Sequence, residues 1–292
     1  MNFKKFTEEI RIALKEKLNR EDICIYSETA VKNNHTLLPG LIIEEKGSNI
    51  LHSIPLKECY DRLKSGDSLS DIADEMADFY NHMHFSNTAL LENFDELKGK
   101  IIYRLVNQKM NEVFLRSVPY MPFLDLAITF HILLETSEEG IASLAITNYH
   151  LNYWGIDAAD LFSLAAQNTE QLLPSILKPY EDYIPAESGK AVRFHQALSS
   201  LRFLSNQYQC YGASCILYEG LLSNLAEDLN SSFYILPCTV DEIAILPESK
   251  DFQPKALREL VQDVVRETVD SEQVLSSHPY YYDRKTKELS CI

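Results

Sequence analysis

The order of apolar and polar residues along the chain first predicts amphipathic helices. Residues 3–18 carry apolar side chains at intervals of three and four, with Lys, Arg and Glu between them, which is the spacing of one helical face. The same spacing follows Ser68 and Asp71, which resemble a capping box for a helix over 70–84, and it returns after Pro254. Further helices are expected over 55–63, 108–117, 148–154, 157–173 and 219–229.

Short runs rich in β-branched and aromatic residues, separated by turn residues, predict strands. Early in the chain such runs predict a meander of three strands, at 23–26, 41–45 and 49–54. Later runs predict a strand at 101–106, a hairpin of 124–135 with 140–147, a hairpin of 201–206 with 211–218, and strands at 233–236 and 242–246.

Hairpins that alternate with helices indicate an α+β fold, with antiparallel sheets built from hairpins and helices packed on one face. A change of pattern near Pro119 predicts two subdomains. Residues 1–118 hold a helix, the meander and further helices, and residues 119–292 hold repeated hairpin–helix units. Residues 174–196 are expected to be a connector with little regular structure, and the segment from His278 to Arg284 an edge strand or a docked extension.

Composition limits the classes of function. The 292 residues are 46% apolar, and their net charge is −16. That charge repels phosphate backbones and anionic lipids, so non-specific binding to nucleic acid or membranes is not expected as the main activity. Six cysteines without a C-x-x-C pair fit a reducing cytoplasm. The longest apolar stretch, 121–134, is too short and too polar for a membrane span.

Motifs that identify common enzyme classes are absent from the sequence. Neither a nucleotide-binding glycine loop, nor G-x-S-x-G, nor H-E-x-x-H occurs, and no cofactor is expected. Cys210 and Cys215 are expected to be structural, because only His195 and Arg202 are close in sequence as activating groups. His131 lies in an apolar run and is expected to be a hydrogen-bonded core histidine.

One short cluster has the composition of a metal site. Asp74, Asp78 and His82 lie at four-residue spacing and therefore share one face of the predicted helix 70–84. Carboxylate and imidazole groups are common metal ligands. The alternative is a solvated polar face, on which the helix dipole favours a histidine near the C-terminal end.

Residues 98–116 are a basic island in an acidic chain. They contain five cations and a single acidic residue, Glu112; the cations are Lys98, Lys100, Arg104, Lys109 and Arg116. Such a group can bind a phosphate, a nucleic-acid end or an acidic partner. The alternative is that these cations pair with acidic residues of the same chain.

A set of short segments occurs in a characteristic order along the chain, at residues 46–50, 105–107, 125–127, 146–148, 154–156, 212–214, 233–238, 240–242 and 281–284. Together these segments resemble an uncharacterised family of Firmicutes, domain of unknown function 5688. The resemblance covers nearly the whole chain. It implies a bacterial, cytoplasmic protein, and it brings no assigned activity, cofactor or catalytic residue.

Two functions from different classes are consistent with these patterns. The first is a non-catalytic binding or regulatory module, for example one that recognises a protein partner, favoured by the missing motifs and the acidic composition. A deep pocket lined by convergent ionisable groups would count against it. The second is an enzyme acting on a phosphorylated or nucleic-acid substrate, favoured by the basic island and by the face of Asp74, Asp78 and His82.

Overall fold

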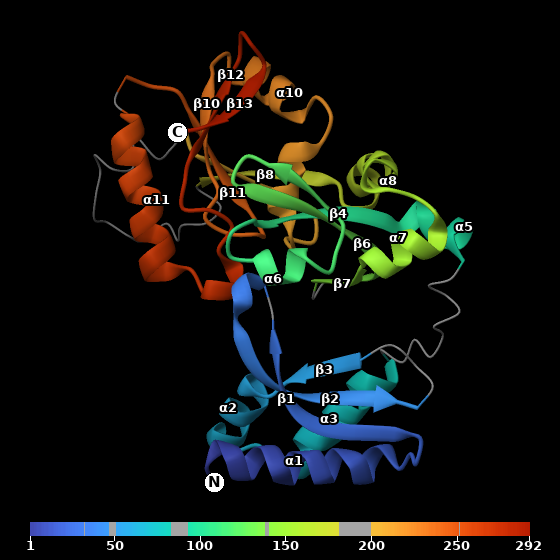
Figure 1. Cartoon of the computed structure of the whole chain (residues 1–292). Helices are drawn as coiled ribbons and strands as arrows, with labels where there is room; N and C mark the ends of the chain where they lie inside the picture. Colours follow the sequence, from blue (N-terminus) through green and yellow to red (C-terminus); the bar gives the residue numbers. More distant parts are fainter. Residues whose placement is uncertain (32, 47–50, 83–92, 138–139, 181–199, 251) are drawn as a thin grey trace. The chain divides into compact units, whose positions relative to one another are not determined.

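A computed structural model describes residues 1–31, 33–46, 51–82, 93–137, 140–180, 200–250 and 252–292. The described chain forms two compact units, Met1–Asn93 and Phe94–Ile292 (Figure 1). Both units are built from antiparallel sheets with helices, so the predicted α+β class is confirmed. The units divide before residue 101 rather than near Pro119, because residues 101–107 pair with a strand of the second unit.

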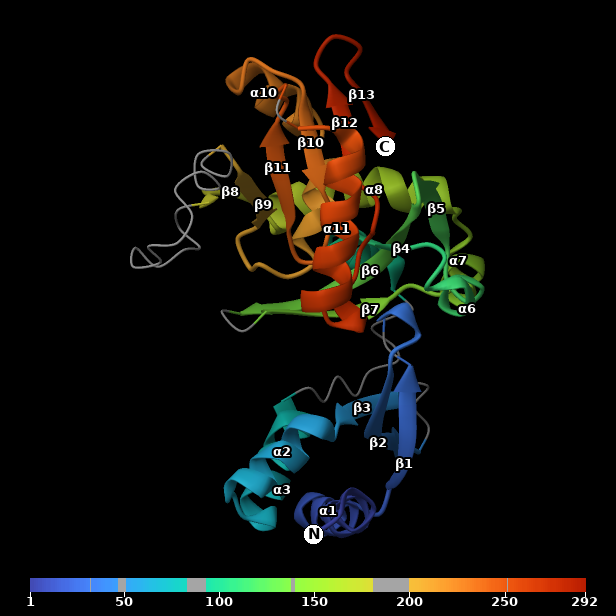
Figure 2. The same ribbon diagram turned by 90° about the vertical axis from the view of Figure 1, so that its left-hand side faces the viewer.

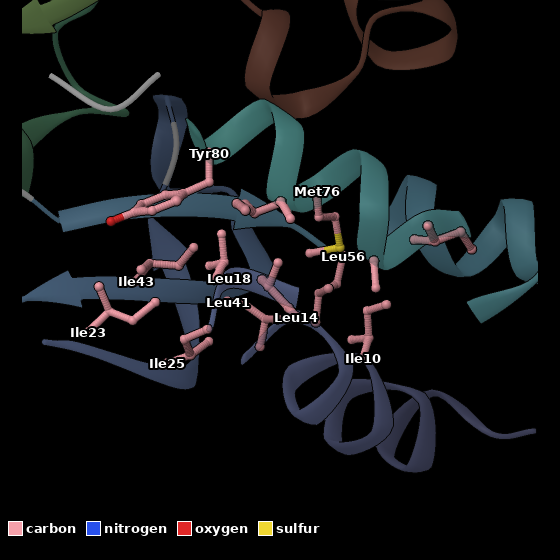
Figure 3. Packing of buried hydrophobic residues seen from close by; sticks show 14 of the residues in the cluster. Ile10, Leu14, Leu18, Ile23, Ile25, Leu41, Ile43, Leu56, Met76 and Tyr80 are labelled. Atoms are coloured by element: carbon pink, nitrogen blue, oxygen red, sulfur yellow. The ribbon is translucent and has the colours of Figure 1, made fainter. Parts of the chain in front are cut away.

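The first unit is a three-stranded antiparallel sheet with helices against it (Figure 3). Its elements are α1 (Phe3–Leu18), β1 (Ile23–Val31), η1 (Asn33–His35), β2 (Leu37–Glu45), β3 (Leu51–Pro55), α2 (Lys57–Ser65) and α3 (Leu69–His82). The meander order β1-β2-β3 is the one that the sequence predicts. Residues 49 and 50, the predicted start of the third strand, lie outside the described residues.

The apolar stripe of α1 packs into the core of this unit. Phe6, Ile10 and Leu14 are completely buried, and they lie with Ile43 of β2 and Tyr80 of α3 in one cluster (Figure 3). Burial of each such side chain contributes roughly 1.5–3 kcal/mol. The spacing of apolar residues over 3–18 therefore predicts correctly which face of α1 is buried.

The second unit contains a four-stranded sheet and a six-stranded sheet. In the first, β6 (Leu126–Ser137) pairs on one side with β4 (Ile101–Asn107) and on the other with β5 (Tyr120–Phe123) and β7 (Gly140–Ala145). Helices α5 (Phe94–Leu97), η2 (Lys98–Lys100), α6 (Glu112–Leu115), α7 (Asn148–Trp154) and α8 (Ala158–Leu172) accompany it. The predicted strand 101–106 is confirmed, and the predicted hairpin of 124–135 with 140–147 is confirmed as the antiparallel pair of β6 and β7.

The six-stranded sheet has the order β13-β12-β10-β11-β9-β8. Helix α11 (Pro254–Thr268) lies against this sheet (Figure 2). Its Leu257 and Val261 belong to one buried cluster with Tyr234 and Leu246. Its elements are β8 (Ser175–Pro179), β9 (Arg202–Asn206), η4 (Gly212–Leu217), α10 (Leu221–Asp228), β10 (Phe233–Leu236), β11 (Ile243–Pro247), α11 (Pro254–Thr268), η5 (Ser271–Gln273), β12 (Tyr280–Asp283) and β13 (Glu288–Cys291).

Several predictions in this unit were wrong. Residues 212–217 form a 3-10 helix instead of a hairpin strand, because residues 212–216 are buried without alternation and such a run does not distinguish strand from helix. The connector contains a strand, β8, which pairs with β9; residues 181–199 lie outside the description. Strand β12 is internal, and β13 forms the edge.

Candidate functional site

The basic island separates into residues with different surroundings. Lys98 forms an ion pair of 2.8 Å with Asp95, and Lys100 is exposed at the end of η2. Arg104 is buried in β4, with 7% of its surface exposed. Lys109 and Arg116 are exposed and line one hollow together. The structure therefore brings two of the five predicted anion-binding residues together.

The turn after β4 explains why Lys109 and Arg116 line the same hollow. The side-chain oxygen of Asn107 accepts a hydrogen bond of 2.9 Å from the Met110 backbone N–H, and Asn111 Nδ2 donates to the Asn107 carbonyl at 2.9 Å. Such local side-chain bonds compete with helix formation. The predicted helix 108–117 is therefore reduced to α6, Glu112–Leu115, with Lys109 before it and Arg116 after it.

The hollow has a volume of about 580 Å³, within the range of small-molecule sites. Its lining consists of Gln108, Lys109, Glu112, Leu115, Arg116, Tyr120 and Asp125. Within the described part of the chain, neither Lys109 nor Arg116 forms an ion pair. The two cations are thus available to an anion from solution, and Glu112 opposes its binding.

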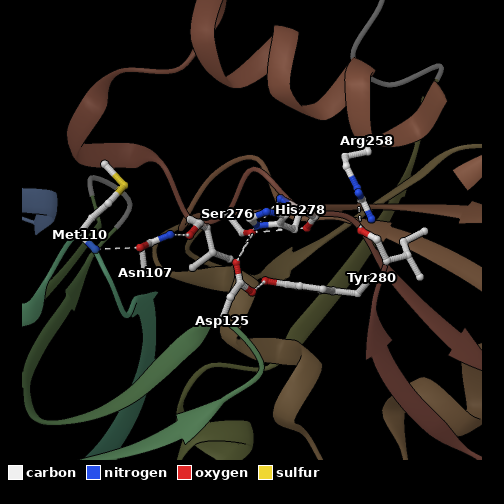
Figure 4. Close-up of polar contacts among 9 residues, drawn as sticks. Asn107, Met110, Asp125, Arg258, Ser276, His278 and Tyr280 are labelled. Carbon is white, nitrogen blue, oxygen red and sulfur yellow. Dashed lines mark hydrogen bonds and ion pairs between the residues drawn. The ribbon is translucent and has the colours of Figure 1, made fainter. Parts of the chain in front are cut away.

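Asp125 is one of the residues that line the hollow. Hydroxyl groups from the C-terminal segment hold its carboxylate (Figure 4). Ser276 Oγ donates to Asp125 Oδ2 at 2.6 Å, and the Tyr280 hydroxyl donates to Oδ1 at 2.6 Å. Burial and the nearby Asp125 raise the pKa of Tyr280, so the phenol remains a donor. This carboxylate is fixed in place.

His278 adds an imidazole beside the same carboxylate. Its Nδ1 lies 3.3 Å from Asp125 Oδ2, and 47% of the His278 side chain is exposed. An Asp–His pair orients the imidazole and leaves its second nitrogen able to accept a proton from a bound molecule. The arrangement can therefore bind an anion, and it has one group that can move a proton.

Sequence reasoning missed Asp125, Ser276 and His278 as members of one group. More than 150 residues separate Asp125 from Ser276 and His278 along the chain. The pattern of apolar residues carries no signal for such a contact. Asp125 lies in a segment of the family resemblance that carries no assigned role. Its contacts with Ser276 and His278 join the turn between β5 and β6 to the segment before β12, which belongs to the other sheet.

The proposed metal ligands remain a prediction. Asp74 forms an ion pair of 2.6 Å with Lys17, which occupies one of the carboxylates. The side chain of His82 lies outside the described residues. Among the side chains that are described, no group of three His, Cys, Asp or Glu residues is arranged to hold a metal ion.

The buried thiols are poor nucleophiles. All six cysteines are free, and burial raises the pKa of Cys215 to about 12 and that of Cys238 to about 11. Burial also raises the pKa of Cys210. A protonated thiol reacts slowly, so the structural role expected for Cys210 and Cys215 fits their surroundings.

Comparison with known proteins identifies a family and no closer relative. Among the described residues, no helix has the length and apolar character required to cross a bilayer. No curated protein and no solved structure matches the chain. One family model matches residues 3–284, and its description is a family of unknown function, DUF5688. The chain belongs to this family.

Proposed function

We propose that this protein is a non-catalytic binding module whose second unit recognises a small oxyanion, of the phosphate class, in the hollow between Lys109 and Arg116. One observation carries the proposal: two exposed cations without an ion pair among the described residues line the same hollow. Charge-assisted hydrogen bonds from Lys and Arg are the strongest contacts that proteins make to phosphate.

The size of the hollow favours a small ligand over a nucleic acid or a protein surface. A volume of about 580 Å³ accommodates a phosphorylated metabolite. The net charge of −16 opposes the approach of a polyanion. A local pair of cations can still hold one phosphate group, because its contacts are short-range.

The test is calorimetric titration of the whole chain with inorganic phosphate at low ionic strength. Each of Lys109→Ala and Arg116→Ala should weaken binding about tenfold, because each removes one charge-assisted contact. Lys100→Ala is the matched control, since Lys100 belongs to the same island but lies outside the lining of the hollow. Equal affinities of wild type, K109A and R116A would reject the proposal.

A second variant tests the sign of the effect. Glu112 lies in the lining with a negative charge, so Glu112→Gln should tighten phosphate binding by about threefold or more. An unchanged or weaker affinity of this variant would mean that the anion binds elsewhere.

An enzyme acting on a phosphorylated substrate is the second candidate, and His278 favours it. The imidazole lies against Asp125, and Asp125 lines the hollow; a general base would have to reach the substrate from this position. Release of nitrophenol from p-nitrophenyl phosphate by the wild type, lost in His278→Gln, would support this function. Equal background rates in both proteins would leave binding as the function.

The same proposal locates the protein in the cytoplasm of a bacterium. The resemblance to the Firmicutes family supports the bacterial source. The six free cysteines support a reducing compartment, because secreted proteins of this size commonly pair theirs.

A further inference from the structure

The remaining cation of the island, Arg104, lies buried and stacked on an aromatic ring. Its guanidinium carbon is 3.6 Å from the centre of the Tyr211 ring, and 7% of its surface is exposed. The described lining of the hollow that holds Lys109 and Arg116 does not include it. Its environment is therefore separate from the proposed binding site.

Two donors of this guanidinium are buried without a partner. Nε and Nη2 make no hydrogen bond to any described residue, and Arg104 forms no ion pair with them. Burial of an unpaired cation strongly destabilises a folded protein. Asp241 lies close enough to interact electrostatically with Arg104, but its Oδ1 accepts a hydrogen bond of 2.8 Å from the Tyr211 backbone. Burial lowers the pKa of Arg104.

The geometry of the two donors selects the ligand. Nε–H and Nη2–H lie along one edge of the planar guanidinium and point in parallel, which suits two oxygens of one carboxylate or phosphate. Arg20 of the same chain uses these two atoms in this way, on the two carboxylate oxygens of Asp22. A halide offers only one acceptor to this edge.

A third buried atom without a partner among the described residues, His131 Nδ1, lies on the same face of the sheet. Arg104 pairs with Thr129 across β4 and β6, and Thr129 Oγ1 lies 3.1 Å from His131 Nε2. Burial, with Arg104 nearby, holds the pKa of His131 far below its ordinary value. The Thr129 hydroxyl has two acceptors within reach, the Arg104 carbonyl at 3.4 Å and the closer His131 Nε2. When it donates to Nε2, the neutral imidazole presents Nδ1–H as a donor.

The ring that covers Arg104 is held in an unusual backbone conformation. Tyr211 has φ 53° and ψ 26°, in the left-handed region, which is uncommon for a bulky residue and occurs where the surrounding structure enforces it. Its backbone N–H is fixed by Asp241. Tyr211 thus adopts a strained backbone conformation in which its ring stacks on the buried guanidinium of Arg104.

We propose that Arg104 and His131, covered by Tyr211, form an internal site for a compact oxyanion, a carboxylate or a phosphate group. Arg104 binds two of its oxygens through Nε and Nη2, and His131 donates to it from Nδ1. The bound charge neutralises the buried guanidinium and stabilises the folded second unit.

Thermal unfolding of the whole chain tests this site. Sodium phosphate or sodium acetate replaces sodium chloride at constant ionic strength. The midpoint should rise with oxyanion concentration in the wild type and in the K109A/R116A double variant. Arg104→Lys keeps the charge and loses the two-donor edge, so its apparent affinity should fall by about tenfold or more. A response to acetate identifies a carboxylate site, and a response to phosphate alone identifies a phosphate site.

A second variant keeps the test valid if R104K does not fold. Asp241→Asn preserves the acceptor for the Tyr211 N–H and removes a negative charge near Arg104, so it should strengthen the response about threefold or more. The proposal is overturned if D241N responds no more strongly than wild type, or if R104K responds equally. If K109A/R116A loses the whole rise in unfolding midpoint, the oxyanion binds in the hollow alone and the internal site is rejected. If the rise persists in K109A/R116A, it supports the internal site whether or not the proposed function is correct.

Discussion

Gly212 shows how closely the chain packs beside Arg104. A Cβ atom built on it would lie 2.0 Å from Ser205 Oγ, 2.5 Å from the Asp241 carbonyl oxygen and 2.6 Å from the Asn206 nitrogen. Two of these neighbours are backbone atoms, which cannot rotate away. The position therefore requires glycine, because there is no space for a side chain. The absence of a side chain allows the turn of Tyr211 and Gly212 to pack against β9.

Gly212→Ala should lower the free energy of unfolding by roughly 1–3 kcal/mol or more, because the added methyl group forces the backbone apart. Urea unfolding at equilibrium measures the change. Gly99→Ala is the control, because nothing lies within 4 Å of a Cβ at that position. Equal stabilities of the two variants would contradict the packing described here.

At this scale the sequence predicts which residues are cationic but not which of them meet. Lys109 and Arg116 meet because Asn107 turns the chain after β4, and Arg104 is buried because its position in β4 faces Tyr211. Neither contact follows from charge or spacing. The core position of His131 was predicted correctly, since a polar residue within an apolar run is buried by its neighbours.

Strand β4 is an edge strand of the four-stranded sheet, and side-chain hydroxyl groups accept hydrogen bonds from its outward backbone N–H groups. The Tyr103 N–H donates to Thr169 Oγ1 of α8 at 3.2 Å, and the Leu105 N–H donates to Ser214 Oγ of η4 at 3.0 Å. An unpaired edge is a template for association with other chains. These two bonds satisfy it internally and connect the four-stranded sheet to α8 and η4.

Thr169→Val should cost about 1–3 kcal/mol of stability, because the buried Tyr103 N–H loses its acceptor while the shape of the side chain is kept. Thr268→Val is the matched control: Thr268 makes the same bond to the carbonyl four residues earlier, on the exposed face of α11. Equilibrium unfolding of both variants decides the point, and similar losses in both would show that the edge bond is unimportant.

Elements with a clear period were predictable, and those shaped by contacts were not. The stripes of α1 and α11 gave their positions correctly. Residues 212–217 did not, because burial on all sides removes the alternation that separates strand from helix. Strand β8 was not predicted, because prolines at 174 and 179 lie at its two ends and made the segment look like a loop.

For the whole molecule, charge and local chemistry act in opposite directions. The net charge of −16 slows the approach of anions, and salt screens this repulsion over about 10 Å. Added salt should therefore have two opposite effects on phosphate affinity. It weakens the long-range repulsion between phosphate and the acidic chain, and it weakens the local attraction of phosphate to Lys109 and Arg116. The α+β class was predictable from the alternation of elements, but the boundary between units was not, because it depends on the pairing of β4 with β6.

The most direct test of the central claim is an anomalous difference map of crystals of the whole chain grown with selenate, a tetrahedral analogue of phosphate. The account predicts a selenium peak in the hollow, with selenate oxygens within about 4 Å of both Lys109 Nζ and the Arg116 guanidinium. A map with no peak between these two side chains, in crystals where selenate is bound elsewhere, would contradict it.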